Sequence, residues 1–147
     1  MKSQLILASS HMLQIKWRHD GKRIVLPVKI FGADNLTDMT SIDAIALLDT
    51  GATVSGINAD VAARLGLRPI GKRPILTAHG LAHIDHFLFR LGAFPDDWAS
   101  PYPFIFPEII GLSLSSSEHF SALLGMDVLR HCDFAMDRSV TCRLILG

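Results

Sequence analysis

The sequence has few cysteines and no excess of charge of either sign. Cys132 and Cys142 are its only cysteines, too few for a disulfide framework, and they flank an expected hairpin turn at residues 137–139. We expect two reduced thiols, as in a cytoplasmic protein, although the spacing also permits one bridge. Lysine plus arginine and aspartate plus glutamate number 14 each. The chain therefore lacks the electrostatic footprint of a protein that binds nucleic acid or an anionic membrane.

The sequence also lacks a hydrophobic run long enough to cross a membrane. The apolar centre of its N-terminus, residues 5–8, is too short for a secretory signal, and we interpret residues 1–10 as an extended strand or arm. We therefore expect a cytoplasmic protein with no membrane partner. A soluble piece of a larger membrane protein would show the same pattern.

The chain is rich in apolar residues arranged in short segments. Hydrophobic residues make up 49% of its 147 residues and charged residues 19%. This composition suits a single domain over residues 1–147, with apolar surface to spare for a homodimer. Many short strands, one or two short helices and frequent turn signals predict an all-β, barrel-like fold.

Period-two alternation and turn residues predict the individual elements. Residues 13–17 and 24–30 alternate on either side of an Asp20-Gly21 turn, which is typical of a β-hairpin. Asn58 can cap a helix that Gly66 ends. Further strands are expected at residues 42–48, 87–91, 104–114 and 140–146, with an exposed loop at residues 92–103.

The most informative motif is Asp49-Thr50-Gly51-Ala52, which follows the apolar strand expected at residues 42–48. A carboxylate at the junction of a buried strand and a tight turn is held rigidly and can still face a cleft. Gly51 permits a close backbone approach that a Cβ would block, and the Thr50 hydroxyl can bond to nearby backbone groups. Taken alone, this tripeptide is also what an ordinary turn contains.

A second segment, residues 122–129, makes the first motif more specific. It contains Leu124, Gly125 and Asp127 and follows the first motif at the spacing typical of a known family. Together the two segments resemble retropepsin-like aspartic proteases, the retroviral branch with cellular and bacterial members. The resemblance implies a closed β-barrel subunit and an aspartic endopeptidase in which Asp49 is catalytic.

The resemblance also implies roles for the neighbouring residues. Thr50 would lock two active-site loops together, and Gly51 and Ala52 would line the floor under the substrate. Leu124, Gly125 and Asp127 would lie behind the site, where a side chain at Gly125 would strike the active-site loop. We expect Asp127 to cap a short helix at residues 128–131.

The chemistry needs two carboxylates, and the chain contains one Asp-Thr-Gly. Peptide hydrolysis by this route uses a water held between two aspartates, one ionised and one protonated. A catalytic site would therefore need Asp49 from two copies of the chain across a twofold axis. The implied partners are a second copy and a peptide or protein substrate, and no cofactor is implied.

The chain departs from the family pattern in two places. Met126 and Thr53 stand where retroviral enzymes carry the two partners of an ion pair. The flap that would close over the substrate lacks the usual glycine-rich pattern. Our candidate for its tip is Ala78, His79, Gly80 and Leu81, since a glycine near a hairpin tip allows a mobile lid.

Two other classes of function remain open. A retropepsin-fold module that binds peptide or dimerises without catalysis would keep the same motifs. His79, His83 and His86 would share one face of a helix and could bind zinc for hydrolysis. On a strand His86 would point away from the other two, and we therefore predict no metal site.

Overall fold

The structure, a computed structural model, describes residues 13–94 and 104–146 of the chain. It is built from β-strands and two short helices, α2 (Ala59–Arg64) and α3 (Met126–Leu129). In chain order the strands are β1 (Leu13–Arg18), β2 (Val25–Gly32), β3 (Ser41–Leu48), β4 (Gly56–Asn58), β5 (Gly71–Thr77), β6 (Gly80–Ala93), β7 (Phe104–Leu114), β8 (Ala122–Leu124), β9 (Asp133–Met136) and β10 (Thr141–Leu146). The predicted all-β class is confirmed.

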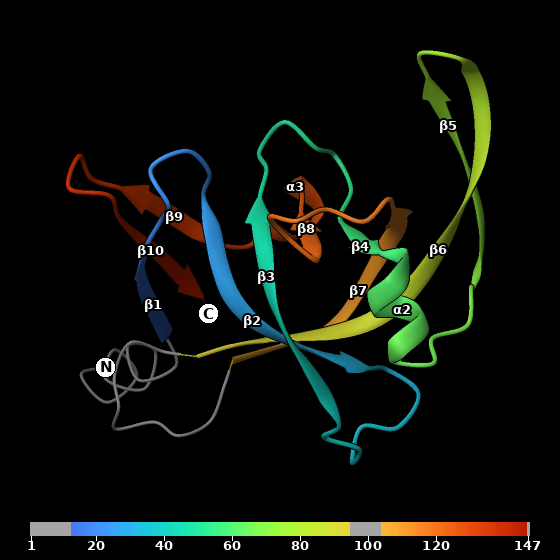
Figure 1. The fold of residues 1–147 in the computed structure, drawn as a ribbon. Helices are drawn as coiled ribbons and strands as arrows, with labels where there is room; N and C mark the ends of the chain where they lie inside the picture. Colours follow the sequence, from blue (N-terminus) through green and yellow to red (C-terminus); the bar gives the residue numbers. More distant parts are fainter. Residues whose placement is uncertain (1–12, 95–103, 147) are drawn as a thin grey trace, which may run out of the picture.

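The barrel is a closed ring of strands in the order β2-β3-β8-β4-β7-β6 (Figure 1). Antiparallel pairing of β2 with β6, from Lys29 opposite Gly92 to Gly32 opposite Phe89, closes the ring. β3 and β8 run parallel, as do β4 and β7, so the strands on either side of the active-site segment, β3 and β4, lie in one sheet. β5 adds to the outer end of β6 and forms a hairpin that stands clear of the barrel.

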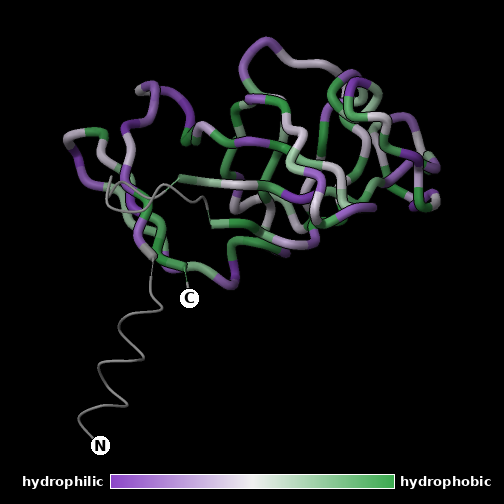
Figure 2. The backbone as a smooth tube through the Cα atoms, turned by 90° about the horizontal axis from the view of Figure 1, so that it is seen from below, coloured by the Kyte–Doolittle hydropathy of each residue, from purple (hydrophilic) through white to green (hydrophobic). Residues whose placement is uncertain are grey.

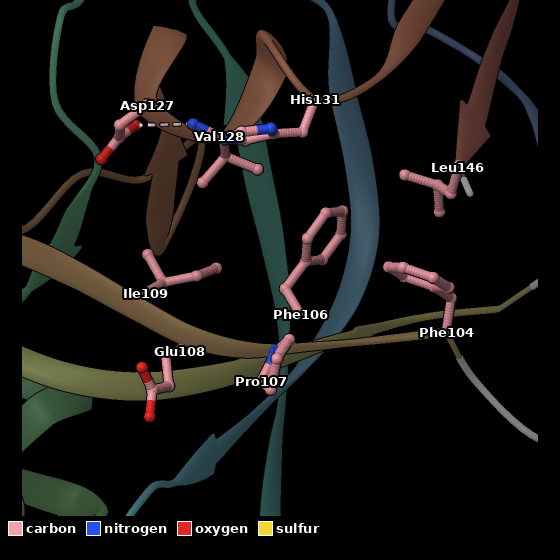
Figure 3. Close-up of a pocket in the computed structure, with 9 residues that line it drawn as sticks. All are labelled: Phe104, Phe106, Pro107, Glu108, Ile109, Asp127, Val128, His131 and Leu146. Atoms are coloured by element: carbon pink, nitrogen blue, oxygen red, sulfur yellow. Dashed lines mark hydrogen bonds between the residues drawn. The ribbon is translucent and has the colours of Figure 1, made fainter.

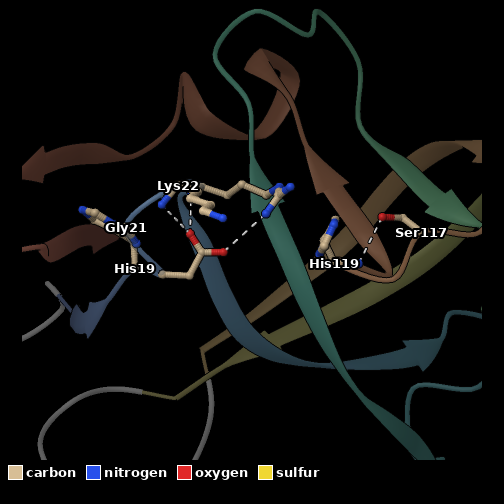
Figure 4. A network of polar contacts seen from close by, with 7 residues as sticks. His19, Gly21, Lys22, Ser117 and His119 are labelled. Atoms are coloured by element: carbon tan, nitrogen blue, oxygen red, sulfur yellow. Dashed lines mark hydrogen bonds and ion pairs between the residues drawn. The ribbon is translucent and has the colours of Figure 1, made fainter.

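The prediction that residues 13–17 and 24–30 pair as a hairpin is wrong. β1 pairs with β10 in a separate sheet of order β1-β10-β9, whereas β2 pairs with β3 and β6 in the barrel. Alternation of apolar and polar residues decides which face of a strand is buried and does not choose its partner. The turn itself is real. The Asp20 carboxylate accepts hydrogen bonds from the amides of Lys22 and Arg23, and Gly21 has a φ of +84° (Figure 4).

The helix that follows the active-site segment is confirmed with one difference. Asn58 stands at the N-cap of α2, but its side chain makes no capping bond and donates from Nδ2 to the Phe120 carbonyl, at 2.7 Å. Asn58 therefore joins the helix to the chain just before β8. Gly66 ends the helix as expected, with a φ of +66° and an amide that bonds to the Ala63 carbonyl.

The remaining strand predictions are largely confirmed. β3, β7 and β10 lie within a residue of their expected ranges. β6 is much longer than residues 87–91 and includes Gly92 and Ala93, which we had assigned to a loop. The rest of that loop and the expected N-terminal arm, residues 1–10, fall outside the described residues, apart from Phe94, which follows β6.

Buried side chains fill the barrel and extend under the smaller sheet. Ile30, Phe89 and Leu91 of the ring and Leu144 of β10 are completely buried within one continuous cluster. Figure 2 shows hydrophobic stretches along the strands and hydrophilic ones mainly in the connections. None of the helices in the described part of the chain is long and apolar enough to span a membrane.

The two cysteines lie on either side of the expected hairpin turn, which joins β9 to β10. Both are free thiols, Cys142 buried and Cys132 half-buried. Burial raises the pKa of each thiol, because it disfavours the charged thiolate. Burial therefore favours the thiol over the reactive thiolate at both positions.

One buried charge holds the loop that joins β2 to β3. Arg90 is 4% exposed and donates from Nε to the Gly32 carbonyl at 2.7 Å and from Nη2 to the Asp38 carbonyl at 2.7 Å. It also donates to the carbonyls of Asn35 and Leu36, and its guanidinium lies 5.4 Å from the Phe31 ring centre. The guanidinium thus replaces the water that these loop carbonyls would otherwise bind.

Substitution of Arg90 should measure the contribution of this buried group. Arg90→Met keeps most of the side-chain volume but leaves the loop carbonyls without a donor, and we expect a loss of about 2 kcal/mol in the free energy of unfolding. The measurement is urea denaturation followed by circular dichroism. Arg73→Met, at an exposed position of β5, is the control and should change stability by less than about 0.5 kcal/mol. Equal midpoints for the two variants would contradict this role of Arg90.

Candidate active site

Asp49 begins the loop that leaves the end of β3. Its amide donates to the Leu124 carbonyl at 2.9 Å, so the backbone is anchored to β8 at this residue. Its carboxylate accepts from the Gly51 amide at 2.9 Å, and its carbonyl accepts from the Ala52 amide at 3.2 Å. The half-buried Asp49 is therefore held in a tight turn, with exposed Thr50 and Gly51 beside it.

The turn from β8 into α3 packs directly behind this loop. The Met126 amide donates to the Ala52 carbonyl at 2.8 Å. A Cβ added at Gly125 would lie 2.8 Å from the carbonyl oxygens of both Ala52 and Val54, closer than real contacts allow. Because Gly125 has an ordinary φ of −93°, the glycine is required by this close approach and not by its backbone conformation.

Asp127 does not cap the helix as we expected. α3 begins at Met126 with Gly125 at the N-cap, so Asp127 already lies in the first turn. Its carboxylate instead accepts from the Ser55 hydroxyl at 2.7 Å and the Ser55 amide at 3.0 Å, and also from the Val128 amide. The capping pattern was misleading because an acidic residue in the first helical turn is favoured with or without a capping bond.

Ser55 is a residue of the site that the sequence did not reveal. It is 1% exposed, and its hydroxyl donates to Asp127 while it accepts from the Gly125 amide at 3.1 Å. Seventy-two residues separate Ser55 from Asp127 (|i−j| = 72), and neither belongs to a periodic pattern. No local signal could have paired them.

The candidate flap residues lie at the tip of the β5–β6 hairpin. Ala78 and His79 form the turn, Gly80 follows with a φ of +107°, and Leu81 lies opposite Leu76. The Thr77 hydroxyl donates to the Gly80 carbonyl at 2.7 Å. Leu76 and Leu81 are 83% and 66% exposed, so two large apolar side chains stand in solvent at the tip.

The hairpin and the active-site loop lie toward the same end of the barrel. Figure 1 shows the hairpin rising at the upper right, while the end of β3 points to the same upper side. A lysine–aspartate ion pair across the hairpin, Lys72 to Asp85 at 2.9 Å, lies closer to the barrel than the turn. The hairpin thus has an ordered stem and an apolar tip.

The three histidines near the candidate flap do not form a cluster. His79 lies in the turn at the hairpin tip, and His83 lies in β6. His83 and His86 lie on opposite faces of β6 because they are three positions apart along the strand. Within residues 13–94 and 104–146, no three histidine, cysteine or acidic side chains could hold a metal ion.

A pocket of about 470 Å³ is lined by residues of β7, α3 and β10 among others, and Asp49 is not part of its lining. Figure 3 shows it between Phe104 and Phe106 of β7, Val128 of α3 and Leu146 of β10. Asp127 stands at its rim with the carboxylate already bonded to Ser55 and Val128. The pocket is therefore separate from the candidate catalytic carboxylate.

A model of the aspartyl protease family matches residues 26–128, which include Asp49, the candidate flap and Asp127. The chain belongs to the aspartyl protease family. The protein is similar in structure to a retropepsin-like aspartic protease from Rickettsia conorii, with a TM-score of 0.60 and 19% identity over 92% of each chain. At that identity the likeness shows the fold, and it confirms the expected retropepsin-like barrel.

The chain is also similar in structure to the protease of EIAV in complex with the inhibitor HBY-793. It has a TM-score of 0.49 and 19% identity, over 78% of this chain and 91% of that one. No curated protein matches the sequence. Family membership therefore rests on residues 26–128, and the fold of this aspartyl protease family member on the rickettsial structure.

The close contact at Gly125 leads to a stability prediction. Gly125→Ala would push a methyl group into the carbonyls of Ala52 and Val54, and we expect a loss of about 2 kcal/mol in unfolding free energy. Gly32→Ala is the matched control, because its Cβ would meet only Leu67 at 3.8 Å. Urea denaturation of both variants measures the difference. A Gly125 variant as stable as the Gly32 variant would show that the loop can move aside.

Proposed function

We propose that the protein is a homodimeric aspartic endopeptidase that hydrolyses peptide bonds with a water activated between two Asp49 carboxylates, one from each subunit. The observation that carries this proposal is the setting of Asp49. It is a half-buried carboxylate at a strand end, held by the Leu124 carbonyl and the Gly51 amide, in a chain of the aspartyl protease family.

The chemistry follows from two carboxylates brought into contact. They cannot both ionise easily, so they share one proton and titrate as a pair, as is established for aspartic proteases. The ionised member takes a proton from the water as the water attacks the scissile carbonyl carbon. The protonated member donates its proton to the carbonyl oxygen, which gives a tetrahedral diol. The carboxyl that took the water proton then gives a proton to the amide nitrogen as the C–N bond breaks, and one diol hydroxyl returns its proton to the other carboxylate. None of these steps needs a metal or an organic cofactor.

The neighbouring residues take supporting roles in this proposal. Thr50 lies exposed beside Asp49, where its hydroxyl can bond to the second active-site loop. Gly51 and Ala52 form the floor, and Leu124, Gly125 and Asp127 support the loop from behind. An extended peptide would lie between this floor and the flap tip, residues 78–81, as an added strand.

A non-catalytic module that binds peptide or dimerises is the second candidate. The observation in its favour is the uncharged pair Met126 and Thr53, both exposed, where retroviral enzymes carry an ion pair. Loss of that pair removes one known means of fixing two loops together. Catalysis distinguishes the candidates, because dimerisation and peptide binding are each compatible with both.

Cleavage of an unstructured protein is the direct test. We expect the protein to cleave casein at mildly acidic pH and Asp49→Ala to abolish cleavage, because no other group can replace the carboxylate at the water. The control is Asp34→Ala, which removes an exposed carboxylate from the loop between β2 and β3. Both variants should remain folded and keep the oligomeric state of the parent. No cleavage by the parent protein at concentrations where it is dimeric would favour the non-catalytic module.

Dilution gives an independent prediction. If each site needs two chains, specific activity should fall as the dimer dissociates, and it should follow the dimer fraction. Sedimentation velocity gives that fraction, and casein cleavage over the same concentrations gives the activity. A fully active monomer would rule out the shared site.

A further inference from the structure

The hairpin of β5 and β6 leaves the barrel at one residue of β6. His86 lies opposite Gly71, the first residue of β5, and also opposite Leu112 of β7. Between Gly80 and Asp85, β6 pairs with β5 alone in the described part of the chain. Figure 1 shows this part of the hairpin standing away from the barrel. A movement of the hairpin as a unit therefore has to bend β6 close to His86.

The ring of His86 packs against the backbone of Gly71. A Cβ built on Gly71 would lie 2.9 Å from the ring atom Cε1 and 3.4 Å from Nε2. Only a residue without a side chain leaves room for the ring there. The Ile70 amide also donates to the His86 carbonyl at 2.9 Å. The ring and the backbone of His86 thus both hold the start of β5, and with it the hairpin.

One nitrogen of this ring has no hydrogen-bond partner. His86 is half-buried, and its Nδ1 is buried without a partner in the described part of the chain. In a neutral imidazole that carries its proton on Nε2, Nδ1 is only an unused acceptor. In a protonated imidazole Nδ1 is an N–H donor and the ring is charged, and a buried charged donor without an acceptor is far more costly. The position beside Gly71 therefore suits the neutral ring.

The cations near the ring add to this preference. His86 faces the outside of the barrel wall, because the next residue, Phe87, is buried in the core. Arg73 of β5 faces the same side, since it lies two residues after the partner of His86. Arg68 is exposed in the connection before β5, and Arg90 further along β6 is bonded to the β2–β3 loop. Positive neighbours disfavour a second positive charge on the ring.

No carboxylate of the adjoining elements faces the ring at close range. The acidic residues of β5, β6, β7 and residues 65–70 are Asp85 and Glu108. Asp85 precedes His86, so it points to the opposite face, where it pairs with Lys72 at 2.9 Å. Glu108 lies four residues before Leu112 on β7, about 13 Å along the strand. These elements therefore offer a protonated His86 neither an acceptor for Nδ1 nor a counter-charge.

We propose that His86 is the hinge residue of the hairpin. While its ring is neutral, it packs on Gly71 and holds the hairpin at a fixed angle to the barrel, and protonation drives the ring away from Gly71 and frees the hairpin. Histidine ordinarily changes charge between about pH 5 and 8, so the hinge acts in that range. Because the neutral ring is the one that holds, the hairpin is ordered at the upper end of this range and is released as the pH falls.

The inference rests on the proposed function only in using the hairpin as a flap. Leu81 is on the same face of β6 as Phe87, and Leu76 lies opposite Leu81, so the exposed apolar tip continues the inner face of the barrel wall. The tip thus presents to a substrate the same face that lines the barrel. Release at His86 would let this face move away from Asp49, so that an extended peptide can enter and its products can leave.

Hydrogen exchange measures the hinge without any substrate. In the parent protein, the protection of the hairpin amides, corrected for the chemical exchange rate, should fall at least about tenfold from about pH 7.5 to about pH 5.5. His86→Phe keeps a planar ring beside Gly71 that cannot be protonated, so its protection should be equal at both pH values. His83→Phe is the matched control, because it replaces the exposed histidine on the other face of β6 and should keep the pH dependence. Thermal unfolding checks the fold of each variant.

Substitution of Gly71 tests the same contact from the other side. In Gly71→Ala the methyl group would meet the ring at 2.9 Å and displace it, so protection of the hairpin at neutral pH should fall to the level that the parent has in acid. Gly80→Ala is the control, because Gly80 is in the same hairpin and also has a positive φ, but its Cβ would meet nothing within 4 Å. It should keep the pH dependence of the parent. A Gly71 variant with the same pH dependence as the parent would contradict the role of this contact.

The outcomes separate the hinge from the proposed function. Equal protection at both pH values in the parent protein would overturn the hinge, whether or not the protein cleaves casein. A pH dependence that persists in His86→Phe would also overturn it, because another group would then be responsible. A hairpin released in acid through His86, in a protein that does not cleave casein, would support the hinge and contradict the protease.

Discussion

The active-site loop depends on the close approach of the β8–α3 turn to its back. Gly125 allows the turn to come within contact of the Ala52 and Val54 carbonyls, and the Met126 amide then bonds to Ala52. Ser55 and Asp127 complete the junction with buried side-chain hydrogen bonds. These contacts join two segments that are far apart in the sequence, and they decide where the carboxylate of Asp49 is held.

The elements that the sequence predicted correctly are those whose signal is local. The end of β3, the glycine that stops α2 and the range of β7 follow from short apolar runs and turn residues. The wrong predictions concern which segments of the chain contact one another. β1 has a clear alternating pattern, but its partner β10 lies at the other end of the chain, and the pattern of β1 contains no information about that pairing. Asp127 was assigned to its own helix because the bond to Ser55 depends on tertiary structure.

The candidate flap shows which features of a hairpin one glycine can predict. Gly80 was correctly located at a hairpin tip, since its φ of +107° suits glycine and few other residues. The length of the hairpin and the exposure of Leu76 and Leu81 were not predictable, because they depend on where β6 leaves β7 and continues with β5 alone. Two leucines exposed at a tip are unfavourable in water, so they are more consistent with a contact partner than with a free surface.

The contacts within one chain already hold the candidate active-site loop in place. The backbone of Asp49 bonds to Leu124, its carboxylate bonds to Gly51, and Ala52 bonds to Met126, all within one molecule. Association of two such loops would therefore lose little conformational entropy at the site itself, which favours a dimer even without the ion pair that Met126 and Thr53 cannot form.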